Sequence, residues 1–534
     1  MFSSFARRHF GFNCFSARPT VLFHRRDFTR CYFSIFEYHK YFVFDQSFHQ
    51  DRIKNDMTLQ IHWASILLVI TVFLFYYNIT DPLELKGEEK VTAGQGSSVT
   101  VKRIVAYSLK KQIELEGEEI FCREGFGNTQ VQIIIEESPS GVWSKVEGSQ
   151  VYLTSLIALD KRLEPFQYLR AVAVIKGSWT EVIYCQILMN DGHVRIIKST
   201  VAAIWYDKWD TNDNNTYYNP NLLSCKLPEL ENNIIPVAVT FSLRPCHISA
   251  KDFHQILKNE GTRQTNFTLC VKPLNFKKDI SLHLVQWIEM CRVLGAQFFH
   301  IFLQRVTKKT RRVLNWYKRQ FPTMFHIEDF KPVEGICQNC SANSFFQSTW
   351  QRRRYEVVSY NKCFYQNLDS RFIIPLDVDE FIVPKKVKYW RNLVEGLDNY
   401  YTSLIIQNVY FFERSKNRSS KPFFLGEFKR NSVPSGKGEN GKSFISTRNA
   451  LTVFNHYALH LLRPGVTNEY FLPFKDGQLN HYKQSCDHVI FPECAEYLSS
   501  PTVVDHVIFK YKSEFYNRYN YVTKEMCKRN TKLL

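Results

Sequence analysis

The chain has 534 residues, of which 44% are hydrophobic and 22% are charged. This composition excludes a disordered chain, and the length exceeds one ordinary domain, so we expect two or three folded units. The net charge of +18 includes the basic runs 308–312 and 352–354. We interpret these runs chiefly as solvated helix faces, with a smaller role in attracting anionic donors or acidic glycans.

The N-terminal part predicts a single membrane anchor. Residues 1–57 show no periodicity and are assigned to a cytosolic segment, and residues 58–79 contain an apolar run long enough to span a bilayer. Residues 1–56 carry nine Lys/Arg against five Asp/Glu, so the positive-inside rule places them in the cytosol. A cleaved signal peptide, with translation starting at Met57, is the alternative.

This topology places the rest of the chain in the lumen and excludes nucleic acid as a partner. Of the 14 cysteines, 12 follow the anchor, and an even number in an oxidising compartment predicts disulfides. Cys337 and Cys340 could form half a zinc site or a redox pair in a cytosolic chain, but here we expect bridges. Glycosylation sequons fit the same topology; they begin at Asn78, Asn214, Asn266, Asn339 and Asn417.

Residues 80–148 are polar and mixed, which is typical of a stem. Residues 149–245 then contain short apolar runs separated by turn signals such as Asn190-Asp191-Gly192, with no long helical pattern. We predict a small antiparallel β domain here, with strands near residues 151–153, 171–175, 182–188 and 194–197.

Residues 265–525 predict a different architecture. Strand-like and helical stretches alternate; strands are expected from Leu269 and at 297–303, 324–327 and 372–376, and helices around 284–294, 306–320 and 345–367. The alternation predicts an α/β domain with a mostly parallel sheet and helices on both faces. Ligands of such sheets bind beyond the carboxyl ends of the strands.

The segment 372–384 carries the strongest functional signal. It reads Phe-Ile-Ile-Pro-Leu-Asp-Val-Asp-Glu-Phe-Ile-Val-Pro, so Asp377, Asp379 and Glu380 stand between apolar flanks. An extended backbone would point Asp377 and Asp379 to one face, where they could hold a hard cation against a diphosphate. A solvated loop is the alternative, but carboxylates between buried segments need a metal or hydrogen bonds.

The residues from about Val151 to Tyr521 resemble glycosyltransferase family 92. The resemblance rests mainly on Leu376-Asp377-Val378-Asp379-Glu380-Phe381 in its strand and helix context. Weaker marks are Leu222 to Pro228, Cys270 to Leu274, Trp287-Ile288-Glu289, Leu294-Gly295, Tyr360 to Cys363, Lys442 to Ile445, His456 and His481-Tyr482-Lys483. The chain departs from the family pattern at Gln286, at Ser446-Thr447-Arg448 and at Lys483.

The resemblance implies a metal-dependent, inverting transferase with a GT-A-like fold, using UDP-galactose as the best-supported UDP-sugar donor. Asp377 and Asp379 would hold Mn²⁺, and His481 would complete the metal site. Carboxylate and imidazole ligands suit Mn²⁺. His456 would contact the donor or acceptor; for both histidines a hydrogen-bonded structural role is the alternative.

An inverting transfer also needs a general base, and a carboxylate is the expected type. Glu380 is the nearest candidate, although it works only if the chain turns after Asp379. Glu427 and Asp476 are alternatives on chemistry alone.

Together these observations predict a single-pass type II membrane protein of the Golgi that moves a hexose from a UDP-sugar onto a glycan or glycoprotein acceptor. One alternative is a catalytically inactive, membrane-tethered glycan-binding protein that keeps the transferase fold. Another is a metal-dependent hydrolase at the same carboxylates, which the lack of a second ligand cluster disfavours.

Overall fold

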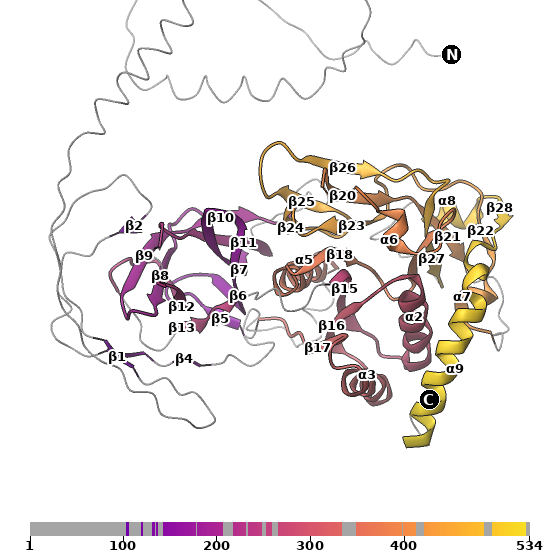
Figure 1. Cartoon of the computed structure of the whole chain (residues 1–534), viewed down its shortest axis with the longest axis horizontal. Helices are drawn as coiled ribbons and strands as arrows, with labels where there is room; N and C mark the ends of the chain where they lie inside the picture. Colours follow the sequence, from indigo (N-terminus) through magenta and orange to yellow (C-terminus); the bar gives the residue numbers. More distant parts are fainter. Residues whose placement is uncertain are drawn as a thin grey trace, which may run out of the picture. The chain divides into compact units, whose positions relative to one another are not determined.

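The computed structural model (Figure 1) describes residues 143–529 and four short strands before residue 137. The gaps within this range are 178, 207–216, 231–232, 248–252, 259–264, 334–348, 398, 413–420 and 485–493. The predicted cytosolic segment 1–57, the predicted anchor 58–79 and most of the predicted stem lie outside the described residues. Within the described part, no helix is both long and apolar enough to cross a membrane.

The first folded region is a sandwich of two mostly antiparallel sheets. One sheet has the strand order β10-β11-β7-β6-β14, with β5 paired to β6, and the other has the order β2-β9-β8-β12-β13-β4. The strands of the first are β5 (Trp143–Lys145), β6 (Val151–Leu163), β7 (Phe166–Lys176), β10 (Thr200–Ala203), β11 (Tyr218–Lys226) and β14 (Leu257–Lys258). Those of the second are β2 (Glu119–Ile120), β4 (Ile135–Glu136), β8 (Tyr184–Met189), β9 (Val194–Lys198), β12 (Pro236–Ser242) and β13 (Phe253–Gln255). A separate pair joins β1 (Arg103–Val105) to β3 (Val131–Ile133).

Strand β7 shows why one run in this region is continuously apolar. Ala171 and Ala173 face the core between the two sheets, whereas Val172 and Val174 face a second core that also contains residues of helix α5. Successive residues of a strand point to opposite faces. Both faces of β7 are therefore buried, and no alternation of polar residues is needed.

The second region is built on a seven-stranded mixed sheet. Its order is β17-β16-β15-β18-β23-β20-β26. The strands are β15 (Thr265–Asn275), β16 (Phe298–Arg305), β17 (Phe325–Asp329), β18 (Ser370–Pro375), β20 (Tyr401–Ile406), β23 (Lys442–Ser446) and β26 (Thr467–Phe471). Strands β17, β16, β15 and β18 run parallel, and β23 runs antiparallel to β18 and β20. The sequence prediction of a mostly parallel sheet is confirmed for this part.

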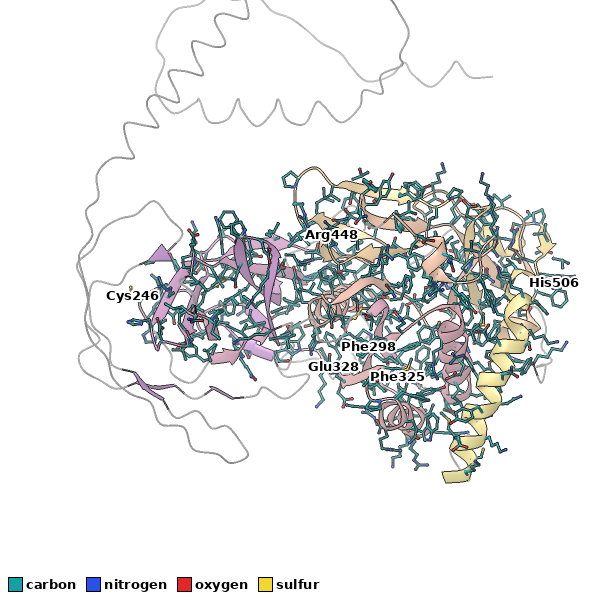
Figure 2. All side chains as sticks on the ribbon, viewed as in Figure 1. Cys246, Phe298, Phe325, Glu328, Arg448 and His506 are labelled. Atoms are coloured by element: carbon teal, nitrogen blue, oxygen red, sulfur yellow. A yellow bond between two sulfur atoms is a disulfide. The ribbon has the colours of Figure 1, made fainter. Side chains whose placement is uncertain are left out.

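Helices cover both faces of this sheet, as the alternation of apolar residues requires. Leu269 and Val271 of β15 face the core that contains residues of α2, α3 and α9, whereas Cys270 between them faces α5. The long helices are α2 (Ser281–Leu294), α3 (Lys308–Gln320), α5 (Thr349–Gln366) and α9 (Lys512–Arg529). Shorter helices are α6 (Trp390–Leu393), α7 (Phe423–Gly426), α8 (Cys494–Ser499) and the 3-10 helix η3 (Val507–Tyr511). In Figure 2, Phe298, Phe325 and Glu328 lie together at β16 and β17, while Cys246 lies in the sandwich.

Helix α2 ends where the sequence predicts. Gly295 has a φ of +131°, a conformation that residues with a Cβ rarely adopt. Its N–H still donates to the carbonyl of Cys291 at 3.1 Å. The glycine therefore closes the helix and lets the chain turn directly into β16.

A three-stranded sheet lies beside the large one and completes the site described below. Its order is β19-β27-β21, formed by β19 (Glu380–Pro384), β27 (Gly477–Lys483) and β21 (Asn408–Phe412). Two ribbons pair β22 (Lys429–Asn431) with β28 (Thr502–Val504) and β24 (Ala450–Val453) with β25 (Ala458–Leu461).

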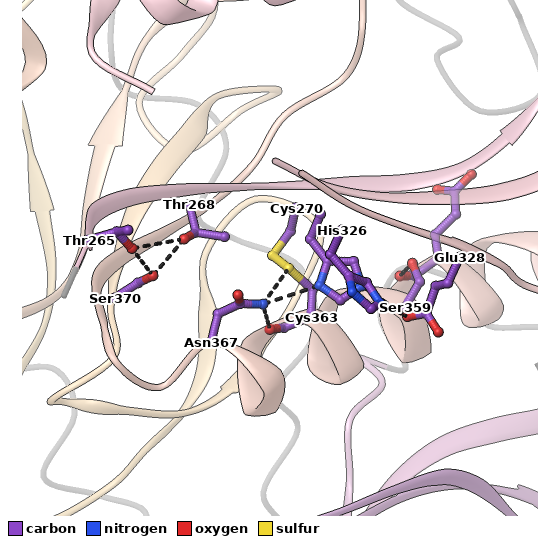
Figure 3. The surroundings of a disulfide bond; sticks show 11 residues. Thr265, Thr268, Cys270, His326, Glu328, Ser359, Cys363, Asn367 and Ser370 are labelled. Carbon is purple, nitrogen blue, oxygen red and sulfur yellow. Dashed lines mark hydrogen bonds and ion pairs between the residues drawn. A yellow bond between two sulfur atoms is a disulfide. The ribbon is translucent and has the colours of Figure 1, made fainter. Parts of the chain in front are cut away.

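The described cysteines agree in part with the expectation of disulfides. Cys185 of β8 is bonded to Cys225 of β11, which links the two sheets of the sandwich, and Cys270 of β15 is bonded to Cys363 of α5 (Figure 3). Further disulfide-bonded residues are Cys246 and Cys494. The thiols of Cys291 and Cys527 are free, so the expectation does not hold for every cysteine that follows the predicted anchor. Cys291 lies buried on α2 within the apolar core.

Arg354 of α5 joins the sandwich to the α/β region. Its buried guanidinium donates to Oδ1 of Asn219 at 2.7 Å and lies 4.2 Å from the ring centre of Trp205. We expect Arg354→Ala to destabilise the protein by about 3 kcal/mol, because it leaves a cavity and removes a buried donor to Oδ1 of Asn219.

The measurement for Arg354→Ala is the midpoint of thermal unfolding, which should fall by about 5–10 °C. Arg352→Ala on the same helix is the matched control, because that residue is only partly buried; it should shift stability by less than about 0.5 kcal/mol. Equal midpoints for the two variants would show that the Arg354 contacts do not hold the two regions together.

Candidate functional site

The site forms where β18 ends and the chain changes sheets. Strand β18 pairs with β15 and β23, whereas β19 pairs with β27. Between them the chain makes a turn, closed by the Glu380 N–H donating to the carbonyl of Asp377 at 3.1 Å. The expectation of an extended backbone from Asp377 to Asp379 was therefore wrong. The chain turns here as it leaves the sheet of β18 and enters the sheet of β19.

Helix α2 holds this turn in place with two side chains on one face. Nε2 of His283 lies 2.9 Å from the carbonyl oxygen of Val378, and Nε1–H of Trp287 donates to the carbonyl of Glu380 at 3.0 Å. The two residues are four positions apart, so they stack along the helix. His283 also stacks on Phe423, with ring centres 4.0 Å apart.

Two lysines from neighbouring strands converge on Asp377. Nζ of Lys272, on β15, lies 3.0 Å from Oδ1, and Nζ of Lys442, on β23, lies 3.4 Å from Oδ2. Burial alone would raise the pKa of Asp377, but the two ammonium groups, Lys272 foremost, hold that pKa well below its ordinary value. Asp377 is therefore an ionised, ion-paired carboxylate.

Helix α5 adds a third cation beside these lysines. Arg353 lies 2.6 Å from Oε2 of Glu356, whose Oε1 is 3.9 Å from Nζ of Lys272. Burial would raise the pKa of Glu356, but Arg353 and Lys272 lower it. We call Lys272, Arg353 and Lys442 the cationic group; it lies at the carboxyl ends of β15 and β18.

Glu380 is the most enclosed carboxylate of the site, with a side chain that is 2% exposed. Its Oε2 accepts the N–H of Asp377 at 3.0 Å and lies 3.4 Å from Nζ of Lys442, and its Oε1 lies 3.4 Å from Nδ1 of His481. Burial raises the pKa of Glu380, which would suit a base. However, both oxygens face groups of the protein, so the geometry favours a positioning role over the predicted role of general base.

Asp379 and His481 form the more open side of the site. Oδ2 of Asp379 lies 3.5 Å from Nε2 of His481, and the Asp379 side chain is 37% exposed. His481 reaches this place because β27 pairs with β19 in a register that sets it opposite Glu380. Burial would raise the pKa of Asp379, but His481 lowers it.

This pair fits a divalent cation. A carboxylate oxygen and an imidazole nitrogen about 3.5 Å apart can ligate one ion, and this mixed donor set suits Mn²⁺. Nδ1 of His481 is buried 3.4 Å from Oε1 of Glu380, so Nε2 is the ring nitrogen that faces Asp379 on the open side. Asp377 fits less well, because each of its oxygens faces an ammonium group.

His456 is partly buried near Lys442 and Asp377. Its Nδ1 is 2.5 Å from the carbonyl oxygen of Gly441, which requires a proton on that nitrogen. Burial, followed by the charge of Lys442, lowers the pKa of His456 to about 3. The residue is therefore a neutral histidine near Lys442. Its predicted contact with donor or acceptor stays a prediction.

The two alternative bases lie elsewhere on the second region. Asp476 pairs with Lys386 at 2.7 Å and precedes His481 by five residues of extended chain, roughly 16 Å. Glu427 follows the short helix α7 and lies near Tyr482. The length of β27 therefore separates Asp476 from Asp379.

A second group of metal-ligand residue types lies under α5 (Figure 3). His300, His326 and Glu328 each place a ligand atom within 4.8 Å of the others. Yet Nδ1 of His300 lies 3.2 Å from the amide nitrogen of Asn367, so its Nε2 carries the proton toward Glu328 at 2.9 Å. Lys362 lies 2.6 Å from the other Glu328 oxygen. In this network Lys362 and His300 already occupy both oxygens of Glu328, whereas Nε2 of His326 is buried without a hydrogen bond among the described residues.

Sequence reasoning missed His283 and assigned no role to Lys272, Arg353 or Lys442. Lys272 lies near the carboxyl end of β15, a strand that neighbours β18 in the sheet, so its place at the same edge was a usable signal. Lys442 belongs to the stretch 442–445 that carries part of the family resemblance. Arg353 offered no local signal, because it lies in a basic run that reads as a solvated helix face.

Comparison with known proteins identifies one family. Residues 265–519 match the model of glycosyltransferase family 92, which confirms the resemblance for these residues; the part from Val151 to residue 264, with the mark at Leu222 to Pro228, lies outside the match. No curated protein sequence matches the chain.

Solved structures that match parts of the chain include the following two, both with low identity. The crystal structure of S. aureus TarS 1-349 in complex with UDP-GlcNAc has 12% identity and a TM-score of 0.22, covering 49% of this chain and 67% of that chain. Ferredoxin-NADP+ reductase from Plasmodium falciparum with 2'P-AMP has 10% identity and a TM-score of 0.11, covering 40% of this chain and 85% of that chain.

Proposed function

Because residues 265–519 belong to glycosyltransferase family 92, we propose that the protein is a metal-dependent, inverting transferase that moves a hexose from a UDP-sugar to a glycan acceptor. UDP-galactose is the proposed donor. The observation that carries the proposal is the turn at Asp377, Asp379 and Glu380, set between the cationic group and His481 at the carboxyl edge of a mostly parallel sheet. The same arrangement supports a GT-A-like fold.

Asp379 and His481 would hold the divalent cation, Mn²⁺. Asp377, the third predicted ligand, would have to give up a contact with Lys272 or Lys442 to join them. When bound, the metal acts as a Lewis acid on the diphosphate and stabilises the charge of the leaving UDP.

The cationic group gives the chain a second means to hold the donor. Lys272 is 27% exposed and Arg353 is 19% exposed, so both can reach a phosphate oxygen from the edge of the sheet. Guanidinium and ammonium groups fixed in this way stabilise charge that develops on a leaving phosphate.

The reaction itself is a single displacement. The acceptor hydroxyl oxygen forms a bond to the anomeric carbon as the bond to UDP breaks, UDP takes the electron pair, and the hydroxyl proton passes to a base. Attack from the face opposite the leaving group inverts the anomeric configuration.

We also propose the setting of this reaction, the Golgi membrane, with one N-terminal span and a lumenal transferase. Support comes from the disulfides Cys185–Cys225 and Cys270–Cys363, because such bonds persist in oxidising compartments. The apolar run at 58–79 supplies the proposed anchor.

The test is sugar transfer by the purified full-length protein with a panel of UDP-sugars and glycan acceptors, with and without Mn²⁺. We expect turnover with UDP-galactose that is lost on chelation of the metal and recovered on its return. Glycan binding without turnover across the whole panel would instead establish the catalytically inactive alternative.

A further inference from the structure

Glu380 divides its two oxygens between the two sides of the site. Oε2 faces the N–H of Asp377 at 3.0 Å and Nζ of Lys442 at 3.4 Å, whereas Oε1 faces Nδ1 of His481 at 3.4 Å. The carbonyl of Glu380 is itself fixed by the indole N–H of Trp287. A buried carboxylate held at its backbone and shared between two sides in this way is suited to orient other groups.

The two ring nitrogens of His481 also face the two sides of the site. Its Nε2 faces Asp379 on the open side, while its Nδ1 is buried against Glu380. A neutral imidazole carries one proton, so one nitrogen donates and the other presents a lone pair. Which nitrogen ligates a metal is set by the hydrogen bond that the other one makes.

We propose that Glu380 is a positioning residue that holds the proton on Nδ1 of His481 and thereby leaves the Nε2 lone pair facing Asp379 for a divalent cation. To form this hydrogen bond, the separation of 3.4 Å between Nδ1 and Oε1 has to shorten by a few tenths of an ångström and the ring N–H has to turn toward Oε1. This inference rests on the metal site of the proposed function and adds the residue that orients it.

The same carboxylate couples this metal side to the cationic group. Oε2 closes the turn onto Asp377 and contacts Lys442, which in turn contacts Asp377. One side chain thus sets the separation between the proposed metal ligands and the cations. A donor diphosphate that contacts both needs that separation to be fixed.

The variant that tests this is Glu380→Gln, which keeps the shape but replaces one oxygen with an amide NH₂. The side that faces the Asp377 N–H and Lys442 must remain an oxygen, since both partners donate. The NH₂ is therefore directed at Nδ1, which must then accept, and the proton of the imidazole moves to Nε2. The lone pair that the metal needs is lost.

The measurement is Mn²⁺ affinity of the full-length protein without nucleotide, followed by the electron paramagnetic resonance signal of free Mn²⁺. We expect Glu380→Gln to weaken Mn²⁺ binding by about 10–100-fold. Glu356→Gln is the matched control, because Glu356 contacts Arg353 and Lys272 but not His481; its Mn²⁺ affinity should stay within about twofold of wild type. A Glu380→Gln affinity that also stays within that range would overturn the proposal.

A second measurement uses the wild-type chain, so it does not depend on the folding of a variant. Nitrogen NMR of ¹⁵N-histidine-labelled protein, with His481→Gln to assign the signal, reports which ring nitrogen carries the proton. We expect protonation at Nδ1, and protonation at Nε2 alone would overturn the inference.

The two hypotheses fail in different ways. Sugar turnover with unchanged Mn²⁺ affinity in Glu380→Gln would sink the role of Glu380 and leave the transferase intact. The opposite result is Mn²⁺ binding by the wild type that Glu380→Gln abolishes, with no turnover by the wild type on any donor. That result would contradict the transferase function and support the role of Glu380.

Discussion

Asp379→Asn should lower the rate of sugar transfer about a thousandfold, the cost of removing several kcal/mol of transition-state stabilisation. Asp379 is the carboxylate on the open side of the site, 3.5 Å from Nε2 of His481, and asparagine keeps its shape while removing its charge. The measurement is kcat with the best donor at saturating Mn²⁺, together with Mn²⁺ affinity without nucleotide. We expect both to fall.

Asp377→Asn is the matched control, because its oxygens face Lys272 and Lys442 and not His481. It should leave Mn²⁺ affinity within about threefold of wild type, since the cations it contacts are not metal ligands, and raise KM for the donor. Equal losses of Mn²⁺ affinity in the two variants would show that both aspartates ligate the metal, as the sequence predicts. Lys272 or Lys442 would then have to move away from Asp377 when the ion binds.

Lys442→Met should destabilise the folded protein by about 3–5 kcal/mol, because it removes the cation beside the buried carboxylate of Glu380 and leaves Asp377 with Lys272 alone. The Lys442 side chain is 3% exposed and lies 3.4 Å from each carboxylate, so water cannot take its place. Thermal unfolding at pH 7.5 is the measurement.

The pH dependence of this variant gives a second check. Burial already raises the pKa of Glu380, and losing Lys442 removes a charge that lowers it. The folded variant then binds a proton more readily than the unfolded chain, so its stability deficit should shrink as pH falls from 7.5 toward 5.

Lys386→Met serves as the control for Lys442→Met. Lys386 pairs with Asp476 at 2.7 Å but is 59% exposed, and such surface pairs contribute less than about 1 kcal/mol. A Lys442→Met protein that unfolds at the same temperature as Lys386→Met would mean that the lysine is not required to neutralise the site.

Local patterns in the sequence predicted the elements that position the site. The spacing of Leu284, Trp287, Ile288 and Cys291 indicated α2, and Gly295 indicated its end. The apolar run before Asp377 indicated β18, and the alternation of strands and helices indicated the parallel part of the sheet. These signals are readable because each depends on residues close together in the chain.

The arrangement inside the site could not be predicted in the same way. The turn at 377–380 arises because β19 pairs with β27, a strand almost 100 residues later. The spacing of the carboxylates within 377–379 carries no information about that pairing. For the same reason the sequence could not predict the contact between Lys442 and Glu380. The direction of the Glu380 side chain was inferred from a strand that continues through 377–380, whereas the chain turns there. His481 was found only through the family resemblance.

The turn at 377–380 also connects the seven-stranded sheet to the three-stranded one. Lys272 and Lys442 belong to the first sheet and His481 to the second, so the angle between the sheets sets how far apart the two kinds of group stand. Leu404 of the large sheet and Leu479 of the small one share a single apolar core. Repacking these leucines, whose side chains lie in the apolar core, would therefore change the separation between the cations and His481 without altering either.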